Sequence, residues 1–97
     1  MMRGTLLLAA ALVAGPAAAD QAPGWMKPGP GQEATAITCG ICHSPEYIRM
    51  NSVFLTQSQW QAEVGKMREV FGAPMDDDTA KQIVEYLGKN YAAPAAR

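Results

Sequence analysis

The chain has 97 residues, of which 48% are hydrophobic, and a formal net charge of −1 at pH 7. This length suits a single domain, and a charge near zero without a basic stripe argues against a nucleic-acid-binding protein. A domain this short buries little apolar surface, so we expect a covalent link or a bound cofactor to stabilise its fold.

The first 19 residues have the features of a secretory signal. Arg3 supplies a positive start, residues 6–13 form a short apolar run, and residues 17–19 are three alanines. The run is shorter than the roughly 20 apolar residues that span a bilayer. We therefore predict cleavage after Ala19, export to the periplasm and no membrane span after signal removal; an uncleaved anchor is the alternative.

The segments before and after the cysteines differ in character. Residues 20–31 are rich in Pro and Gly and predict an irregular N-terminal arm. Residues 32–43 carry Ala34, Ile37 and Ile41 at helical spacing, which predicts a short helix that includes the cysteines. Residues 44–57 show no sustained period and predict a loop, which in a compact domain of this size indicates a functional role.

Two longer helices are expected after this loop. Ser58 and Gln61 form a capping-box pattern at the start of the first. One helical face is formed by Trp60, Val64, Met67 and Phe71, and Gly72 and Pro74 end the helix.

Three aspartates, residues 76–78, favour the positive end of the next helix dipole. Its apolar face is formed by Ala80, Ile83, Val84, Leu87 and Tyr91, and Pro94 ends it. No segment alternates as a strand does. We predict an all-α domain of about three helices over residues 32–93, followed by a tail at 94–97.

The two cysteines and the single histidine lie together in Cys39-Gly40-Ile41-Cys42-His43. This is the C-x-x-C-H pattern of c-type haem attachment. Thiols three residues apart can reach the two vinyl groups of one porphyrin, and His43 is then placed as the proximal iron ligand. The motif predicts one haem c, attached covalently through Cys39 and Cys42, with the helices of a small class I-like cytochrome c wrapped around it.

Three other interpretations of the cysteines are weaker. A thioredoxin-type redox pair requires a βαβ context. A disulfide between Cys39 and Cys42 closes too small a loop to stabilise the fold much. A zinc site requires four ligands, and the chain offers two Cys and one His.

The sixth iron ligand is expected to be a methionine, the usual partner of histidine in electron-carrying cytochromes. Met50 follows His43 too closely to cross to the other haem face. Met67 lies on an apolar helix face, and Met75 lies in a turn after Pro74. The residues themselves do not decide whether Met67 or Met75 is the sixth ligand. The alternative role of each is to pack in the hydrophobic core.

With the haem motif in place, residues 27–91 resemble the small mono-haem cytochrome subunit of bacterial sulfite dehydrogenases, the sulfite:cytochrome c oxidoreductases. The resemblance is carried by Lys27-Pro28-Gly29-Pro30-Gly31 with Glu33, by the haem motif with Ser44, Tyr47 and Ile48, and by Trp60, Val64, Lys66-Met67, Phe71-Gly72-Ala73-Pro74, Ile83, Tyr86-Leu87 and Tyr91. The chain departs from the family at residues 50–53, where the family has a Gln-Pro pair.

The resemblance implies a partner and an iron ligand. The partner is a molybdenum-cofactor subunit that oxidises sulfite, from which the cytochrome accepts electrons one at a time and passes them to a soluble cytochrome c. The ligand is Met67, in the Lys-Met pair. No catalytic site is expected on the chain itself, although it would be the electron-transfer subunit of an enzyme.

Several side chains have a functional and a structural interpretation. Tyr47 and Trp60 are candidates to donate hydrogen bonds to a haem propionate, with packing as the alternative. Arg49 and Arg68 are candidates to steer a partner, with solvated surface charge as the alternative. For the whole chain, the alternatives are a free periplasmic shuttle serving another dehydrogenase or oxidase, and an enzyme or sensor with an open iron face, such as a small peroxidase.

Overall fold

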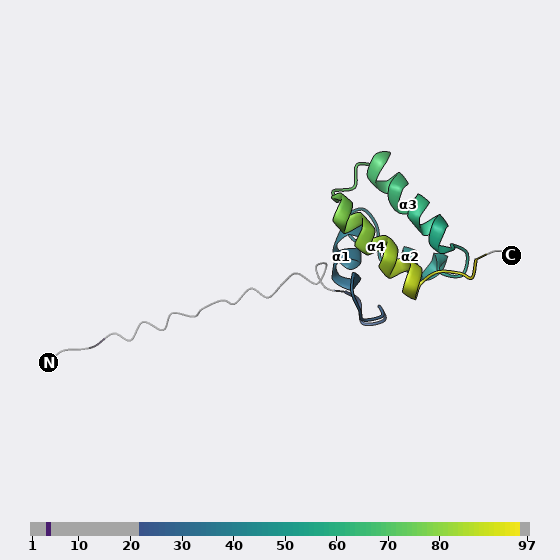
Figure 1. The fold of residues 1–97 in the computed structure, drawn as a ribbon. Coiled ribbons are helices and arrows are strands. Elements are labelled where there is room, and N and C mark those ends of the chain that lie inside the picture. Colours follow the sequence, from purple (N-terminus) through teal and green to yellow (C-terminus); the bar gives the residue numbers. More distant parts are fainter. Residues whose placement is uncertain (1–3, 5–21, 96–97) are drawn as a thin grey trace.

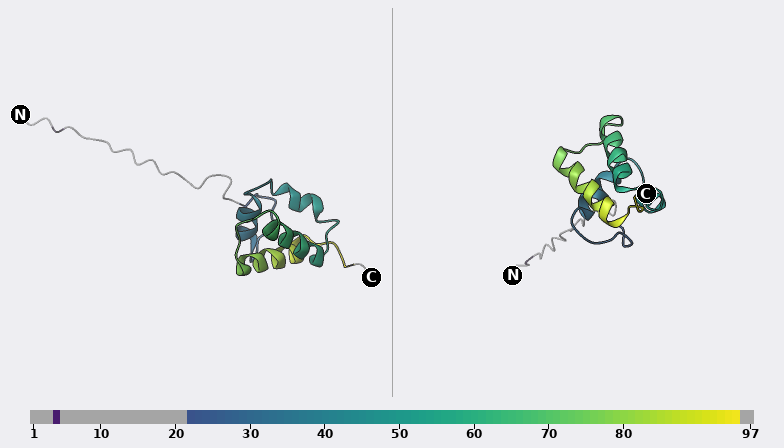
Figure 2. Two further views of the ribbon diagram at one scale, coloured as in Figure 1. Left: turned by 90° about the horizontal axis from the view of Figure 1, so that it is seen from above. Right: turned by 45° about the vertical axis from the view of Figure 1, so that its right-hand side comes forward.

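The computed structural model describes residue 4 and residues 22–95. Over these residues the protein is all-α, with four helices and no strand: α1 (Gln32–Cys39), α2 (Glu46–Asn51), α3 (Gln57–Glu69) and α4 (Asp77–Asn90). Helix α4 packs against both α3 and α1, and α3 and α4 lie side by side (Figures 1 and 2). The all-α prediction is confirmed for this part of the chain, while the predicted signal lies outside it except for Gly4.

The fourth helix is α2, which lies inside the segment predicted as a loop. The prediction of a loop over all of residues 44–57 was therefore wrong, and the described residues contain four helices where about three were predicted. A helix of six residues makes fewer than two turns, and only one of its side chains, Ile48, is buried. A single buried residue leaves no period in the sequence, so the helix has no signal that pattern analysis detects.

Helix α1 ends earlier than predicted, at Cys39 rather than at residue 43. The backbone N–H of Gly40 still donates to Ala36 O, but the N–H of Ile41 donates to Thr38 O in a tighter turn. Glycine in this position favours a helix end because it loses more conformational entropy in a helix than other residues. Cys42 therefore lies in the turn after the helix, and the prediction of one helix carrying the whole motif was wrong.

The start of α3 is capped by Thr56, two residues before the predicted cap. The Gln59 N–H donates to Thr56 Oγ1 (3.3 Å), and the Thr56 N–H donates to Gln59 Oε1 (2.9 Å). Residues 56–61 contain two overlapping capping patterns, Thr56 with Gln59 and Ser58 with Gln61, and the predicted cap was the second. The helix also ends before Phe71, which is 68% exposed and not on its buried face as predicted.

Helix α4 begins as predicted from its aspartates. Asp76 is the N-cap, and its Oδ1 accepts from the Thr79 N–H (2.8 Å), while the next two aspartates occupy the first turn. Ile83 and Leu87 are buried, which confirms the predicted apolar face at these positions. None of the helices in residues 22–95 has the length and apolar character that crossing a bilayer requires.

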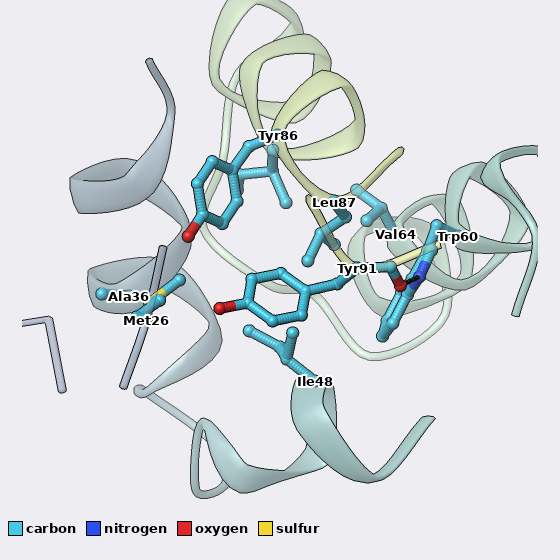
Figure 3. Close-up of a cluster of buried hydrophobic side chains, with 9 residues drawn as sticks. Met26, Ala36, Ile48, Trp60, Val64, Tyr86, Leu87 and Tyr91 are labelled. Carbon is cyan, nitrogen blue, oxygen red and sulfur yellow. Dashed lines mark hydrogen bonds between the residues drawn. The ribbon is translucent and has the colours of Figure 1, made fainter. Parts of the chain in front are cut away.

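An aromatic core joins α3 and α4 to the N-terminal arm (Figure 3). Met26, in the arm, is buried, and the arm backbone at Lys27 is held by two tyrosines of the C-terminal part. The Tyr86 hydroxyl donates to Lys27 O (2.5 Å), and the Lys27 N–H donates to the Tyr91 hydroxyl (2.8 Å). Residues 22–31 thus pack as part of the folded domain.

Gly31 shows why the arm and α4 approach so closely. Its φ of 90° lies in the left-handed region, and a Cβ at this position would lie 2.7 Å from Gln82 O and 2.8 Å from Tyr86 Cβ. Only glycine adopts this conformation without strain and leaves room for the α4 backbone. The start of α1 is thereby fixed against α4, which sets the position of the cysteine motif at the other end of α1.

Candidate functional site

A cavity of about 360 Å³ lies between the end of α1, helices α3 and α4, and the loop that joins these two helices. This volume is within the range of small-molecule and cofactor pockets, which are mostly apolar with a few polar groups. The wall is formed by Thr38, Cys39, Cys42, His43, Val64, Met67, Phe71, Ala73, Met75 and Ile83. Most of these side chains are apolar, and the exceptions cluster at the cysteine motif.

The cavity brings together the residues that the sequence singled out for haem. Cys39, Cys42, His43 and Met67 all line it, although they come from residues up to 28 positions apart in the chain. Met75 lines the cavity as well, so both Met67 and Met75 remain candidates for the sixth ligand. Met50 is 68% exposed and lies outside the cavity wall.

The two cysteines differ in their surroundings. Both are free thiols. Cys39, the last residue of α1, is partly buried, and this burial raises the pKa of its thiol to about 11, because a thiolate is poorly solvated there. Cys42 is exposed in the turn that follows. Because both side chains reach the cavity, a flat ligand inside it could be tied to the chain at two points.

His43 is oriented by its neighbour. Its Nδ1 lies 3.3 Å from Ser44 O. A carbonyl oxygen only accepts, so this contact requires a proton on Nδ1. In the neutral imidazole the lone pair is then on Nε2, the state in which a histidine ligates a metal.

The ring of His43 also contacts a tyrosine that connects it to α3. The ring centroids of His43 and Tyr47 are 5.1 Å apart, and the Tyr47 hydroxyl donates to Glu63 Oε2 (3.1 Å). Burial, together with the hydrogen bond and the charge of Glu63, raises the pKa of Tyr47. Glu63 was not among the predicted site residues, since nothing in the chain order indicates that it faces Tyr47.

Trp60 has a structural role here. Its side chain is 1% exposed, and its indole N–H donates to Tyr91 O (2.7 Å), the dashed contact in Figure 3. Neither Trp60 nor Tyr47 belongs to the cavity wall. In this structure the Trp60 indole N–H donates to Tyr91 O and the Tyr47 hydroxyl donates to Glu63, so both donors already have a partner within the chain.

Arg49 and Arg68, the candidates for steering a partner protein, each form an ion pair with a carboxylate of the same chain. Arg49 Nη2 lies 2.6 Å from Glu46 Oε2, and its guanidinium lies over the Trp25 ring at 4.9 Å. Arg68 Nη1 lies 2.6 Å from Asp77 Oδ1, so that this ion pair connects α3 with the start of α4. Both contacts give the arginines a local role and leave less of their charge for a partner.

Residues 22–95 contain no group of three His, Cys, Asp or Glu side chains that could hold a metal ion together. No protein-family model matches the sequence, and the search of curated proteins finds no match.

Proposed function

We propose that this protein is a periplasmic electron-transfer cytochrome c with one haem, attached through Cys39 and Cys42 and ligated by His43 and Met67. The observation that carries the proposal is the shared cavity, because its apolar walls gather two thiols, the imidazole of His43 and the thioethers of Met67 and Met75. Two thioether bonds and His–Met axial ligation need this set of donors.

The remaining wall residues fit a porphyrin better than a polar substrate. Val64 and Ile83 are almost fully buried, and Ala73 adds a further apolar contact. Such walls exclude water, and low polarity around a haem is one of the factors that set its reduction potential. A bound haem supplies one-electron chemistry, while the chain holds it and orients His43 through Ser44 O.

The proposed role is that of an electron carrier, because the polar groups of the cavity wall are the donors that a covalently attached haem would use. For the electron donor, the support is the family resemblance of residues 27–91, and the proposed donor is a molybdenum-cofactor subunit that oxidises sulfite. A soluble cytochrome c is the proposed acceptor.

Haem attachment is tested by expressing the full chain with a c-type maturation system in a bacterial periplasm. The expected product carries one haem that acid and organic solvent do not extract, detected by mass and by the pyridine haemochrome spectrum. C39A and C42A should each retain one thioether bond, and the double variant should lose covalent haem. A chain without haem in all four forms would refute the proposal.

The donor is tested on the protein purified gently from its native periplasm. Reduction of the haem by sulfite, with a molybdenum protein in the same fraction, supports the sulfite dehydrogenase partner. A haem that stays oxidised with sulfite but is reduced by dithionite would contradict that partner and favour a free shuttle with another donor. Binding of added azide or cyanide to the oxidised protein as isolated at the rate of an open, five-coordinate haem would favour the open-face alternative, because a methionine-ligated iron binds them only after the thioether dissociates.

A further inference from the structure

The second methionine of the cavity has no role in the proposed function. Met67 projects from α3, and Met75 from the loop before α4, yet both line the wall that also contains His43. Of the three methionines after the haem motif, these two share the cavity, whereas Met50 is exposed elsewhere. A thioether is an iron ligand wherever it reaches the open axial position.

The loop holds Met75 close to Met67. The Ala73 N–H donates to Met67 O (2.9 Å), and the Met75 N–H donates to Ala73 O (2.9 Å). The chain reverses at Gly72, whose φ is 70°, a conformation that glycine adopts readily. Arg68 and Asp77 then pair across the loop at 2.6 Å. These contacts fix the backbone of both methionines relative to each other.

The side chains themselves remain adaptable. Methionine is unbranched with three rotatable bonds, so its sulfur can move by several ångströms while the backbone stays in place. Met75 is only partly buried and packs at the edge of the core rather than within it. A change of rotamer, without refolding of the loop, is the movement by which one sulfur would replace the other in the cavity.

From these contacts we infer that Met75 is an alternative axial ligand of the proposed haem iron. It binds in place of Met67 when the Met67 thioether dissociates from the iron. In this exchange one iron–sulfur bond breaks and another forms, with no net transfer of electrons or protons. The consequence is an iron that stays six-coordinate and closed to small ligands. The inference rests on the proposed haem, and it concerns residues that the resemblance leaves without a role.

The test uses the full chain matured with haem, in the variants M67L, M75L and M67L/M75L, with M67L/M50L as the matched control. Haem content is measured first, so that a chain without haem refutes the proposed function and is not confused with failure of this inference. The readout is the far-red methionine–iron absorption band of the oxidised protein. M67L and M67L/M50L should keep the band, shifted in position, and M67L/M75L should lose it.

A folded M67L holoprotein without the band would overturn the inference, and so would loss of the band in M75L, since Met75 would then be the primary ligand. A second measurement does not depend on M67L folding. Cyanide binding to oxidised M75L should be severalfold faster than to wild type or M50L, because Met75 no longer competes for the vacated position. Equal rates in the three proteins would also overturn it.

Discussion

Replacing Trp60 by Phe separates a structural role of this residue from a haem-contacting one. The substitution removes the indole N–H and leaves Tyr91 O, buried in the core, without this donor. An unsatisfied buried acceptor costs about 1–3 kcal/mol. The lost five-membered ring leaves a void of about 40 Å³, which at roughly 24 cal/mol per Å³ adds about 1 kcal/mol. We expect W60F to lower the free energy of unfolding by about 2–4 kcal/mol.

The assay is guanidinium unfolding of the holoprotein followed by far-UV circular dichroism. The matched control is W25F, because Trp25 is only partly buried and meets Tyr91 edge to face at 6.0 Å. Its loss should cost no more than about 1 kcal/mol. A W60F variant that is no less stable than W25F would refute the reasoning from the buried hydrogen bond.

The same variant has a functional readout. Since the indole N–H is committed to Tyr91 O, the haem spectrum and the reduction potential of W60F should match those of wild type. A shifted potential together with unchanged stability would instead place Trp60 at a haem propionate, as one interpretation of the sequence had it.

Two further predictions concern the ends of helices. G31A should destabilise the fold by at least about 2 kcal/mol, because the left-handed backbone is strained for alanine and its Cβ would clash with Tyr86 and an α4 carbonyl. G24A is the control, because a Cβ there meets open space and the backbone is not left-handed, and equal costs in thermal unfolding would contradict this account. Hydrogen bonds from Thr79 hold the pKa of Asp76 below its usual value, so the stabilisation by this cap is complete above the unfolded pKa of about 4 and is lost as pH falls through the lower folded pKa. D76N keeps a cap but cannot titrate, so the stability difference between wild type and D76N should shrink on acidification, and a difference that is constant from pH 6 to pH 2 would show that the cap does not titrate as described.

The parts of the fold that the sequence predicted are those with long periodic patterns. Helix α4 has an amphipathic face and acidic residues at its start, and the structure confirms both. Helix α2 was missed because one buried residue, Ile48, makes no pattern. The cap of α3 was placed two residues late, since Thr56 and Ser58 each begin a capping pattern and only tertiary packing decides between them.

The sequence leads to a candidate site more directly than to its walls. Cys39, Cys42 and His43 lie within five consecutive residues, so the haem prediction needs no fold, and the structure brings all three to one cavity. Glu63 could not be connected to Tyr47, because their contact depends on how α3 crosses the segment after the motif. Sequence spacing has no information on such contacts between elements.

Helix α3 shows how one apolar face serves two purposes. Trp60, Val64 and Met67 follow each other at helical spacing, and the sequence predicts only that they share a face. In the structure Trp60 enters the aromatic core, Met67 lines the cavity, and Val64 belongs to both. The cavity wall is therefore continuous with the most buried part of the protein. For this reason a ligand of the cavity would stabilise the fold by binding the native state, and in so small a domain the proposed haem would contribute to stability as well as to the proposed electron transfer.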